Sequence, residues 1–223
     1  ILRKKISHMK KYIGMAWPSD GLNDSEYWRY LPNNYELLIS RYRVSGSLKP
    51  EIIKKEGNIN TISKSIESLN YKKLDIIILC DFACSVMNLN YHKISELYFT
   101  NKFKIPCINI LSATLNFINK RRKKLSIISP YNKQITEKFS SLVQNNSSIA
   151  SIDYLSLNSE VEIDKIDTKI KTLKLHLLDN DILFLGGGIS ISHFYKKFKK
   201  NYGINIYSSP LILIKNTINI LDG

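Results

Sequence analysis

The sequence predicts an α/β fold of two pseudo-symmetric lobes, each a parallel sheet flanked by helices, with the active site in the cleft between them. First, the run Ile76-Ile-Ile-Leu79 is apolar without alternation, which is typical of a strand buried on both faces. Second, strand-like runs alternate with helical patterns along the chain. Third, three strand blocks recur in the same order about 100 residues later, which indicates a duplicated unit.

The first half of the chain is expected to begin with a strand over 11–17, a turn over 18–21, a short helical or irregular segment over 24–32 and a strand over 35–44. Apolar residues at helical spacing predict a helix with one buried face, and they are Ile59, Ile62, Ile66 and Leu69. After the strand that ends at Cys80, a helix is expected from Cys84 to about Thr100. A strand over 105–111 then leads into a helix with Ser112 as its N-cap.

The second half repeats these blocks. Residues 125–132 resemble 13–20, with Pro130 matching Pro18, and residues 203–214 resemble 105–115. Residues 181–188 resemble the strand that begins at Asp75, and this alignment matches Cys80 with Gly186. We therefore expect one lobe from residues 11–113 with a C-terminal helix over 210–223, and a second lobe from residues 114–209.

The charge of the chain raises nucleic acid or an acidic surface as a partner, because 33 Lys and Arg outnumber 19 Asp and Glu, a formal net charge of +14. The lysines are dispersed, however, and the one dense cluster, at 120–124, reads as a solvated connection. No helix-turn-helix, zinc-finger or aromatic RNA-binding signature is present. We expect no nucleic-acid partner; a positive field also steers small carboxylates toward a cleft.

The composition, 43% hydrophobic, is that of an ordinary globular protein. No apolar run approaches the ~20 residues of a membrane helix, and no signal peptide is recognisable, so we expect no membrane partner and a cytoplasmic location. Three cysteines indicate reduced thiols rather than a disulfide framework. Met9 is expected to be a native start, and the sequence leaves a homo-oligomer open.

Cys80 is the leading candidate for chemistry. Parallel sheets bind ligands beyond the carboxyl ends of their strands, and Cys80 lies at that place. The alternative is structural, because cysteine is often a small buried hydrophobe. A single thiol can protonate the enolate left by loss of carbon dioxide, or can add to an activated double bond and later leave.

Several motifs together resemble the aspartate/glutamate racemase superfamily, most closely its maleate isomerase and arylmalonate decarboxylase branch. They are the Pro18 loop, the cysteine-bearing strand end, the run Ile105-Pro-Cys-Ile-Asn-Ile-Leu-Ser-Ala-Thr-Leu-Asn116, the strand end Ser129-Pro-Tyr131 and the segment Gly203-Ile-Asn-Ile-Tyr-Ser-Ser-Pro210. The resemblance covers nearly the whole chain from about Lys11. It implies chemistry at the α-carbon of a small mono- or dicarboxylate, without a metal or an organic cofactor and typically with one cysteine in each lobe.

The sequence departs from that pattern. The first-lobe cysteine is Cys80, or Cys84 under another alignment, whereas the second-lobe position falls among Gly186, Gly187 and Gly188. Racemisation needs a group on each face of the α-carbon, so a two-cysteine racemase is disfavoured. Decarboxylation of a substituted malonate is expected first and cis-trans isomerisation of a butenedioate second. A non-catalytic carboxylate-binding protein is the third alternative.

Substrate-binding groups are expected in the neighbouring loops. Backbone N–H groups of Gly186, Gly187 and Gly188 could bind a carboxylate or an enediolate oxygen, or the glycines could simply form a tight turn. The resemblance places Tyr131 and Asn132 as donors to the substrate carboxylate, although a loop tyrosine is also often a packing residue.

The first-lobe turn supplies Pro18 and Ser19, and its Asp20 would repel a carboxylate unless protonated or turned away. Asp81 would raise the pKa of the Cys80 thiol through like charge, which suits a proton donor better than a nucleophile. The alternative role of Asp81 is that of a helix cap.

Overall fold

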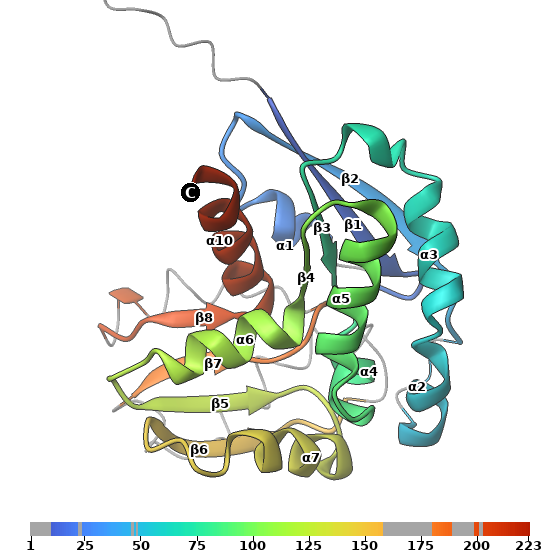
Figure 1. The fold of residues 1–223 in the computed structure, drawn as a ribbon. Helices are drawn as coiled ribbons and strands as arrows, with labels where there is room; N and C mark the ends of the chain where they lie inside the picture. The colour runs from blue at the N-terminus through green and yellow to red at the C-terminus, as the bar shows by residue number, and fades with distance from the viewer. Residues whose placement is uncertain are drawn as a thin grey trace, which may run out of the picture.

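The computed structural model describes residues 10–21, 24–45, 47, 49–157, 180–188, 199–200 and 203–223. Within them the chain forms two four-stranded parallel sheets flanked by helices, which confirms the predicted fold class (Figure 1). The residue ranges 1–9, 158–179 and 189–198 lie outside the described residues, and Met9 is among them.

The first sheet has the strand order β2-β1-β3-β4. Its strands are β1 (Lys11–Pro18), β2 (Tyr35–Tyr42), β3 (Ile76–Leu79) and β4 (Cys107–Asn109). The helices of this part are α1 (Ser25–Trp28), α2 (Pro50–Glu56), α3 (Ile59–Glu67), the 3₁₀ turn η1 (Tyr71–Lys73), α4 (Phe82–Met87) and α5 (Tyr91–Phe103).

The second sheet repeats this order as β6-β5-β7-β8. Its strands are β5 (Leu125–Ser129), β6 (Ile149–Tyr154), β7 (Asp181–Phe184) and β8 (Ile206–Ser208), and the helices are α6 (Ile110–Asn119), α7 (Lys133–Val143) and α10 (Ser209–Asp222). The two sheets therefore have the same strand order: in each, the first strand along the chain lies between the second and the third. This is the internal symmetry that the sequence repeat predicts.

Burial explains why these segments form strands and helices. Ile76, Ile77 and Ile78 of β3 are fully buried, as their continuous apolar run predicts for a central parallel strand. Helix α3 buries Ile62 and Ile66 on one face, which is the amphipathic pattern read from the sequence.

Two helix boundaries differ from expectation. The predicted helix after Cys84 is in fact two helices, α4 and α5, separated by Asn90 in the left-handed conformation (φ 56°), and Cys84 lies inside the first of them. Helix α6 begins at Ile110 with Asn109 as its cap, so the expected Ser112 cap is wrong. The Asn109 side chain accepts a hydrogen bond from Leu111 N at 2.8 Å, and an amide oxygen at this position satisfies a free helical N–H.

The ladder registers fix which residues of the two lobes correspond. In the first sheet Ala16 lies opposite Leu79, and Cys80 N donates to Ala16 O. In the second sheet Ile128 lies opposite Phe184, and Leu185 N donates to Ile128 O. Since Ala16 and Ile128 each stand two residues before the matched prolines, Cys80 corresponds to Leu185.

The expected alignment of Cys80 with Gly186 is therefore wrong by one residue. The residue that corresponds to Gly186 is Asp81. Matching Asp75 with Asp181 in sequence pairs Cys80 with Gly186. In the structure, however, Asp75 precedes β3 whereas Asp181 is the first residue of β7.

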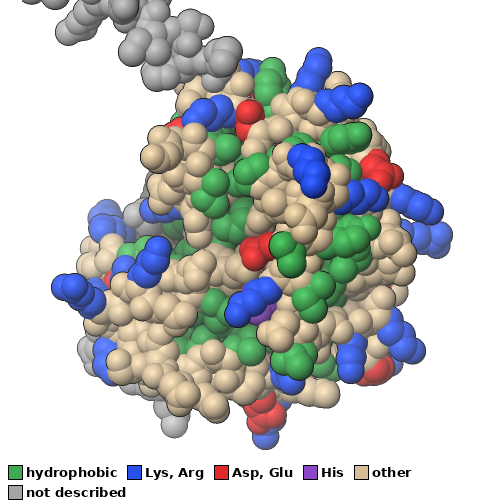
Figure 2. Space-filling view, in the orientation of Figure 1, with side chains coloured by type: hydrophobic (Ala, Val, Ile, Leu, Met, Phe, Trp, Pro, Cys, Tyr) green, Lys and Arg blue, Asp and Glu red, His purple; other side chains and the backbone are tan. Residues whose placement is uncertain are grey.

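Helices α6 and α10 pack against each other between the two sheets (Figure 1). Helix α10 also contacts β3 and α1 of the first lobe, and Lys11 Nζ pairs with Asp222 at its end at 2.8 Å. Basic side chains are spread over the visible face rather than gathered in one stripe (Figure 2). Among the described residues, no helix is both long and apolar enough to cross a membrane.

Candidate active site

A cavity of about 60 Å³ lies beyond the ends of β1 and β3, where the second lobe contributes Tyr131. Four predicted site residues line it, namely Pro18, Cys80, Asp81 and Tyr131. The other lining residues are Asp20, Val44, Ser47, Ile53, Glu56, Phe82 and Ala83. The position is the one expected for a ligand site of a parallel sheet, at the carboxyl ends of its strands.

Asp81 is one of three carboxyls that line this cavity, together with Asp20 and Glu56. Its side chain caps α4, because Oδ1 accepts from Cys84 N at 3.0 Å, and Oδ2 accepts from the Tyr42 hydroxyl at 3.0 Å. Burial raises the pKa of the Asp81 carboxyl to about 6, the two hydrogen bonds oppose the rise, and the nearby Asp20 and Glu56 add to it. The carboxyl is thus a helix cap that also titrates close to neutral pH.

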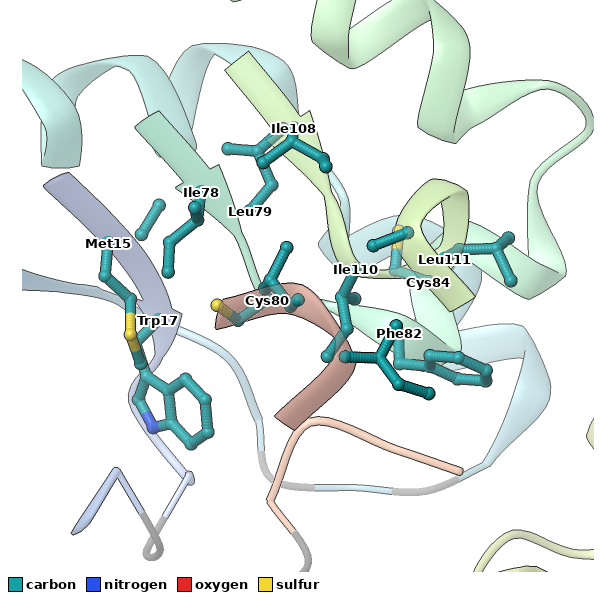
Figure 3. Close-up of a cluster of buried hydrophobic side chains, with 14 of the residues drawn as sticks. Met15, Trp17, Ile78, Leu79, Cys80, Phe82, Cys84, Ile108, Ile110 and Leu111 are labelled. Atoms are coloured by element: carbon teal, nitrogen blue, oxygen red, sulfur yellow. The ribbon is translucent and has the colours of Figure 1, made fainter. Parts of the chain in front are cut away.

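Cys80 lies directly before Asp81 and is only 2% exposed. In Figure 3 its sulfur points toward Met15 and Trp17, within the core of the first lobe. Burial raises the pKa of the thiol well above its ordinary value, a hydrogen bond with Tyr27 opposes that, and Asp81 raises it further. Asp81 raises the pKa of Cys80, as predicted, although burial is the larger cause. Cys80 therefore remains a neutral thiol at neutral pH.

Cys84 is fully buried on α4, and its sulfur lies away from that of Cys80 (Figure 3). Asn88 Nδ2 donates to its Sγ at 3.3 Å, and the sulfur fills the space beside Gly57, where a β-carbon would come within 2.0 Å of it. Burial raises its pKa, with Asp81 as the next cause. Cys84 is not among the residues that line the cavity, which favours Cys80 of the two candidates.

The glycine turn of the second lobe packs directly against the end of β3. A β-carbon on Gly187 would lie 2.5 Å from the Cys80 carbonyl oxygen, so only glycine permits this approach. The Tyr27 hydroxyl donates to Gly187 O at 3.0 Å and joins the two lobes at this point. Gly186 has φ +101°, a conformation that favours glycine, and lies against the Tyr131 hydroxyl.

Gly186, Gly187 and Gly188 are not lining residues of the 60 Å³ cavity. Close backbone packing and the positive φ explain the first two glycines, so the tight-turn interpretation has direct structural support. The structure brings the Cys80 strand end and the glycine turn together as the sequence predicts, but in contact rather than across an open space.

The remaining predicted residues lie around this centre. Tyr131 stacks on Phe82 with ring centroids 6.0 Å apart, which ties the second lobe to α4. Asn132 caps α7 by accepting from Ile135 N at 3.1 Å, and the exposed Ser19 accepts from Val44 N at 3.1 Å. Asn132 and Ser19 do not line the cavity.

The cavity is acidic, and Glu56 is the carboxylate that no sequence motif predicts. Asp20, Glu56 and Asp81 line it, and among the described residues no lysine or arginine does. Burial raises the pKa of Asp20, and Glu56 raises it further. Asp20 is visible in the sequence as a carboxylate in the Pro18 turn, whereas Glu56 ends α2 without any motif that marks it.

The donor set does not point to a metal ion. Over the described ranges of the chain, no group of three or more His, Cys, Asp or Glu side chains has the arrangement of a metal site.

Neither a family model nor a curated protein matches the sequence. The structure is similar to the maleate isomerase Iso from Pseudomonas putida S16, with a TM-score of 0.78 and 14% identity over 95% of this chain and 93% of that chain. It is similar to the Nocardia farcinica maleate cis-trans isomerase, seen with a covalently bound succinylcysteine intermediate, with a TM-score of 0.77 and 13% identity over 95% and 93%. The structure is also similar to a liganded variant of arylmalonate decarboxylase, with a TM-score of 0.74 and 16% identity over 96% of this chain and 94% of that chain. At these identities the likeness establishes the fold, which is that of the enzymes the sequence motifs resemble.

Proposed function

We propose that this protein is a cofactor-independent enzyme acting at the α-carbon of a small mono- or dicarboxylate, and that it decarboxylates a substituted malonate. One observation carries the proposal. A carboxyl with a pKa of about 6, Asp81, lies on the cavity at the end of β3, whereas the equivalent end of β7 carries Gly186 and no side chain. The carboxyls that line the cavity, Asp20, Glu56 and Asp81, all belong to the first lobe, whereas the second lobe contributes Tyr131, so the acids lie on one side of the site.

Decarboxylation needs such a one-sided acid. When the bond to the departing carboxylate breaks, its electron pair stays on the α-carbon as an enediolate, and one proton must then be delivered to that carbon. The protonated Asp81 donates its O–H proton to the α-carbon and becomes a carboxylate, which water reprotonates before the next turnover. A general acid works best when its pKa lies near the working pH, and the pKa of Asp81 meets that condition.

Cys80 is the less suitable acid because it is 2% exposed and its pKa is raised well above the usual range. The same raised pKa disfavours a nucleophilic thiolate, so cis-trans isomerisation through a covalent adduct is the second candidate. Racemisation lacks its second group at Gly186. Asp81 is thus assigned as the catalytic acid, and Cys80 as a buried neighbour that shapes the strand end.

The acidic lining sets the expected pH dependence. Protonated Asp81 is the active donor, and charged Asp20, Glu56 and Asp81 would repel an approaching carboxylate. Turnover is therefore expected to be greatest below about pH 6 and to fall as the pH rises through the pKa of Asp81.

Proton NMR in D₂O, with phenylmalonate, a disubstituted malonate and maleate as substrates, tests the reaction. Decarboxylation produces a monocarboxylate carrying deuterium at the α-carbon, whereas isomerisation of maleate produces fumarate. We expect Asp81→Asn to abolish deuterated product and Cys80→Ala to retain most of it. Cys107→Ala, a thiol that does not line the cavity, is the matched control.

Two outcomes would contradict the assignment. If Cys80→Ala is inactive and Asp81→Asn is active, the thiol is the acid and the fold operates with a buried cysteine. If no substrate turns over but small carboxylates bind in a way that Asp81→Asn changes, the protein is a non-catalytic carboxylate-binding protein. The small volume of the cavity is the feature that favours this alternative.

A further inference from the structure

A second and larger hollow, of about 360 Å³, lies between α6 and α10 and shares no lining residue with the cavity at Asp81. These two helices lie side by side in Figure 1 and follow β4 and β8, the last strands of the two sheets. We call this hollow the helix groove. Its volume is within the range of small-molecule sites, whereas the cavity at Asp81 is several times smaller.

The helix groove is positively charged. Lys120 follows the end of α6, Lys215 lies on α10, and both are exposed. The described residues provide no ion pair or hydrogen bond to either ammonium group, and no carboxylate lines the groove. Within the described part of the chain, each lysine therefore keeps an uncompensated charge at the rim of the groove. Charged side chains of this kind favour an anionic ligand with several oxygen acceptors.

Polar amides add further donors. Asn116 of α6 and Asn216 and Asn219 of α10 line the groove. An asparagine amide can both donate and accept hydrogen bonds, so these side chains suit the hydroxyl and ether oxygens of a polar ligand. Amides and ammonium groups from both helices thus surround the same space.

The inner wall of the groove is aromatic. The rings of Phe117 and Tyr207 have centroids 4.9 Å apart, and the Arg121 guanidinium lies 5.2 Å and 4.8 Å from them. Arg121 is held in place because its Nη1 donates to the Tyr207 hydroxyl at 3.2 Å and its Nη2 pairs with the buried Asp181. The two rings are tilted by 51° to each other and the guanidinium is fixed beside them, so the wall offers aromatic and cationic faces against which a planar ring can pack.

We propose that the helix groove binds a small phosphorylated compound that carries a planar ring, about the size of a nucleoside monophosphate. The phosphate lies between Lys120 and Lys215, and the ring lies against Phe117, Tyr207 and the Arg121 plane. Such a ligand contacts both helices, and α10 is in turn anchored to β1 through the Lys11–Asp222 pair. The site is separate from the proposed catalytic cavity, so its existence does not depend on the proposed reaction.

Calorimetric titration of the full chain with adenosine 5′-monophosphate at low salt tests this proposal. We expect saturable binding of one molecule, with adenosine and inorganic phosphate each bound at least ten-fold more weakly. The double variant Lys120→Gln/Lys215→Gln should weaken binding of the nucleotide at least ten-fold. Lys72→Gln/Lys138→Gln removes the same charge from exposed lysines outside the groove, and it should change the affinity less than two-fold.

Several results would overturn the proposal. Equal losses in the two double variants would mean that the net positive charge of the chain attracts anions without a site. Inorganic phosphate that binds as tightly as the nucleotide would remove the role of the aromatic wall. Unchanged affinity in Lys120→Gln/Lys215→Gln would place the ligand elsewhere. Thermal unfolding of each variant checks that surface substitutions have left the fold intact.

Discussion

Asp81 and Gly186 stand at equivalent positions in the two sheets, each two residues beyond the last paired residue of a central strand. The duplicated fold thus presents a carboxyl at the end of β3 and a bare backbone at the end of β7. The proposed reaction depends on this asymmetry rather than on a pair of thiols. The asymmetry is also the feature that a sequence alignment anchored on Asp75 and Asp181 misplaces by one residue.

Asp81→Asn should change how stability depends on pH. The pKa of Asp81 is raised to about 6 from an ordinary 3.8, so the folded state binds the proton more tightly than the unfolded state. The free energy of unfolding of the wild type should therefore fall as pH rises from about 4 to about 6, by at most about 3 kcal/mol from this group. Asparagine keeps an oxygen for the helix cap but does not titrate.

Urea unfolding at pH 4.5 and pH 7.5 measures this effect. The variant should gain stability relative to wild type at the higher pH, whereas a difference that is the same at both pH values would mean that the carboxyl has an ordinary pKa. Asp20, whose pKa is also raised, contributes a smaller slope of the same sign to both proteins.

Gly187→Ala should destabilise the protein by about 1–3 kcal/mol, because the new β-carbon would meet the Cys80 carbonyl oxygen at 2.5 Å and the backbone of β3 cannot easily yield. Gly203→Ala is the comparison. Gly203 has φ +66°, but no atom lies within 4 Å of the position that a β-carbon would take. The loss of stability in Gly203→Ala therefore measures only the cost of a positive φ in alanine, about 1 kcal/mol. Equal losses in thermal or chemical unfolding would show that the contact between the lobes is not tight.

Asp181→Asn should destabilise the protein by about 2–3 kcal/mol. Asp181 is fully buried and pairs with Arg121 and with Lys123, the latter at 2.6 Å. Burial alone would raise the pKa of Asp181, but hydrogen bonds from Lys123 and Asn205 outweigh it and the pKa lies below the usual range. The expected loss is below the roughly 3–5 kcal/mol of a fully buried pair, because the Lys123 side chain is 57% exposed.

The matched control for this pair is Glu137→Gln, whose carboxylate meets Lys133 at 3.7 Å with both side chains about two-thirds exposed. Removal of such a pair should alter unfolding by less than about 0.5 kcal/mol. A loss at Asp181 no greater than that at Glu137 would contradict the role assigned to the buried carboxylate.

The three thiols should differ in reactivity toward an aromatic disulfide reagent at pH 8. Cys107 is partly exposed, whereas Cys80 and Cys84 are buried, and burial raises the pKa of all three. We expect at most one thiol, Cys107, to react in the native protein and all three to react in denaturant. Rapid native labelling of Cys80, located by peptide mass spectrometry, would mean that its sulfur opens to solvent.

Much of the fold could be predicted because local patterns were strong. The unbroken apolar run of β3, the amphipathic face of α3 and the ordered repeat of strand blocks each point to the same architecture. Helix boundaries were less predictable, since Asn109 and Ser112 are both acceptable caps and only the chain path selects the first. Pro18, Cys80, Asp81 and Tyr131 could be placed on the site from their positions at strand ends.

The sequence by itself determined that two similar parallel sheets would form, and it placed the candidate site residues at the ends of their strands. Only the tertiary structure decided that the Asp81 carboxyl caps α4 while the Cys80 sulfur points toward Met15 and Trp17, although both residues line the cavity. The physical reason is that both residues lie beyond the end of β3, where hydrogen bonds rather than strand alternation orient the side chains, and the Tyr42 hydroxyl that holds the Asp81 carboxyl is distant in the sequence. The acidic lining from Glu56 and the groove between α6 and α10 likewise arise from segments that are distant in sequence, and no local pattern records their meeting.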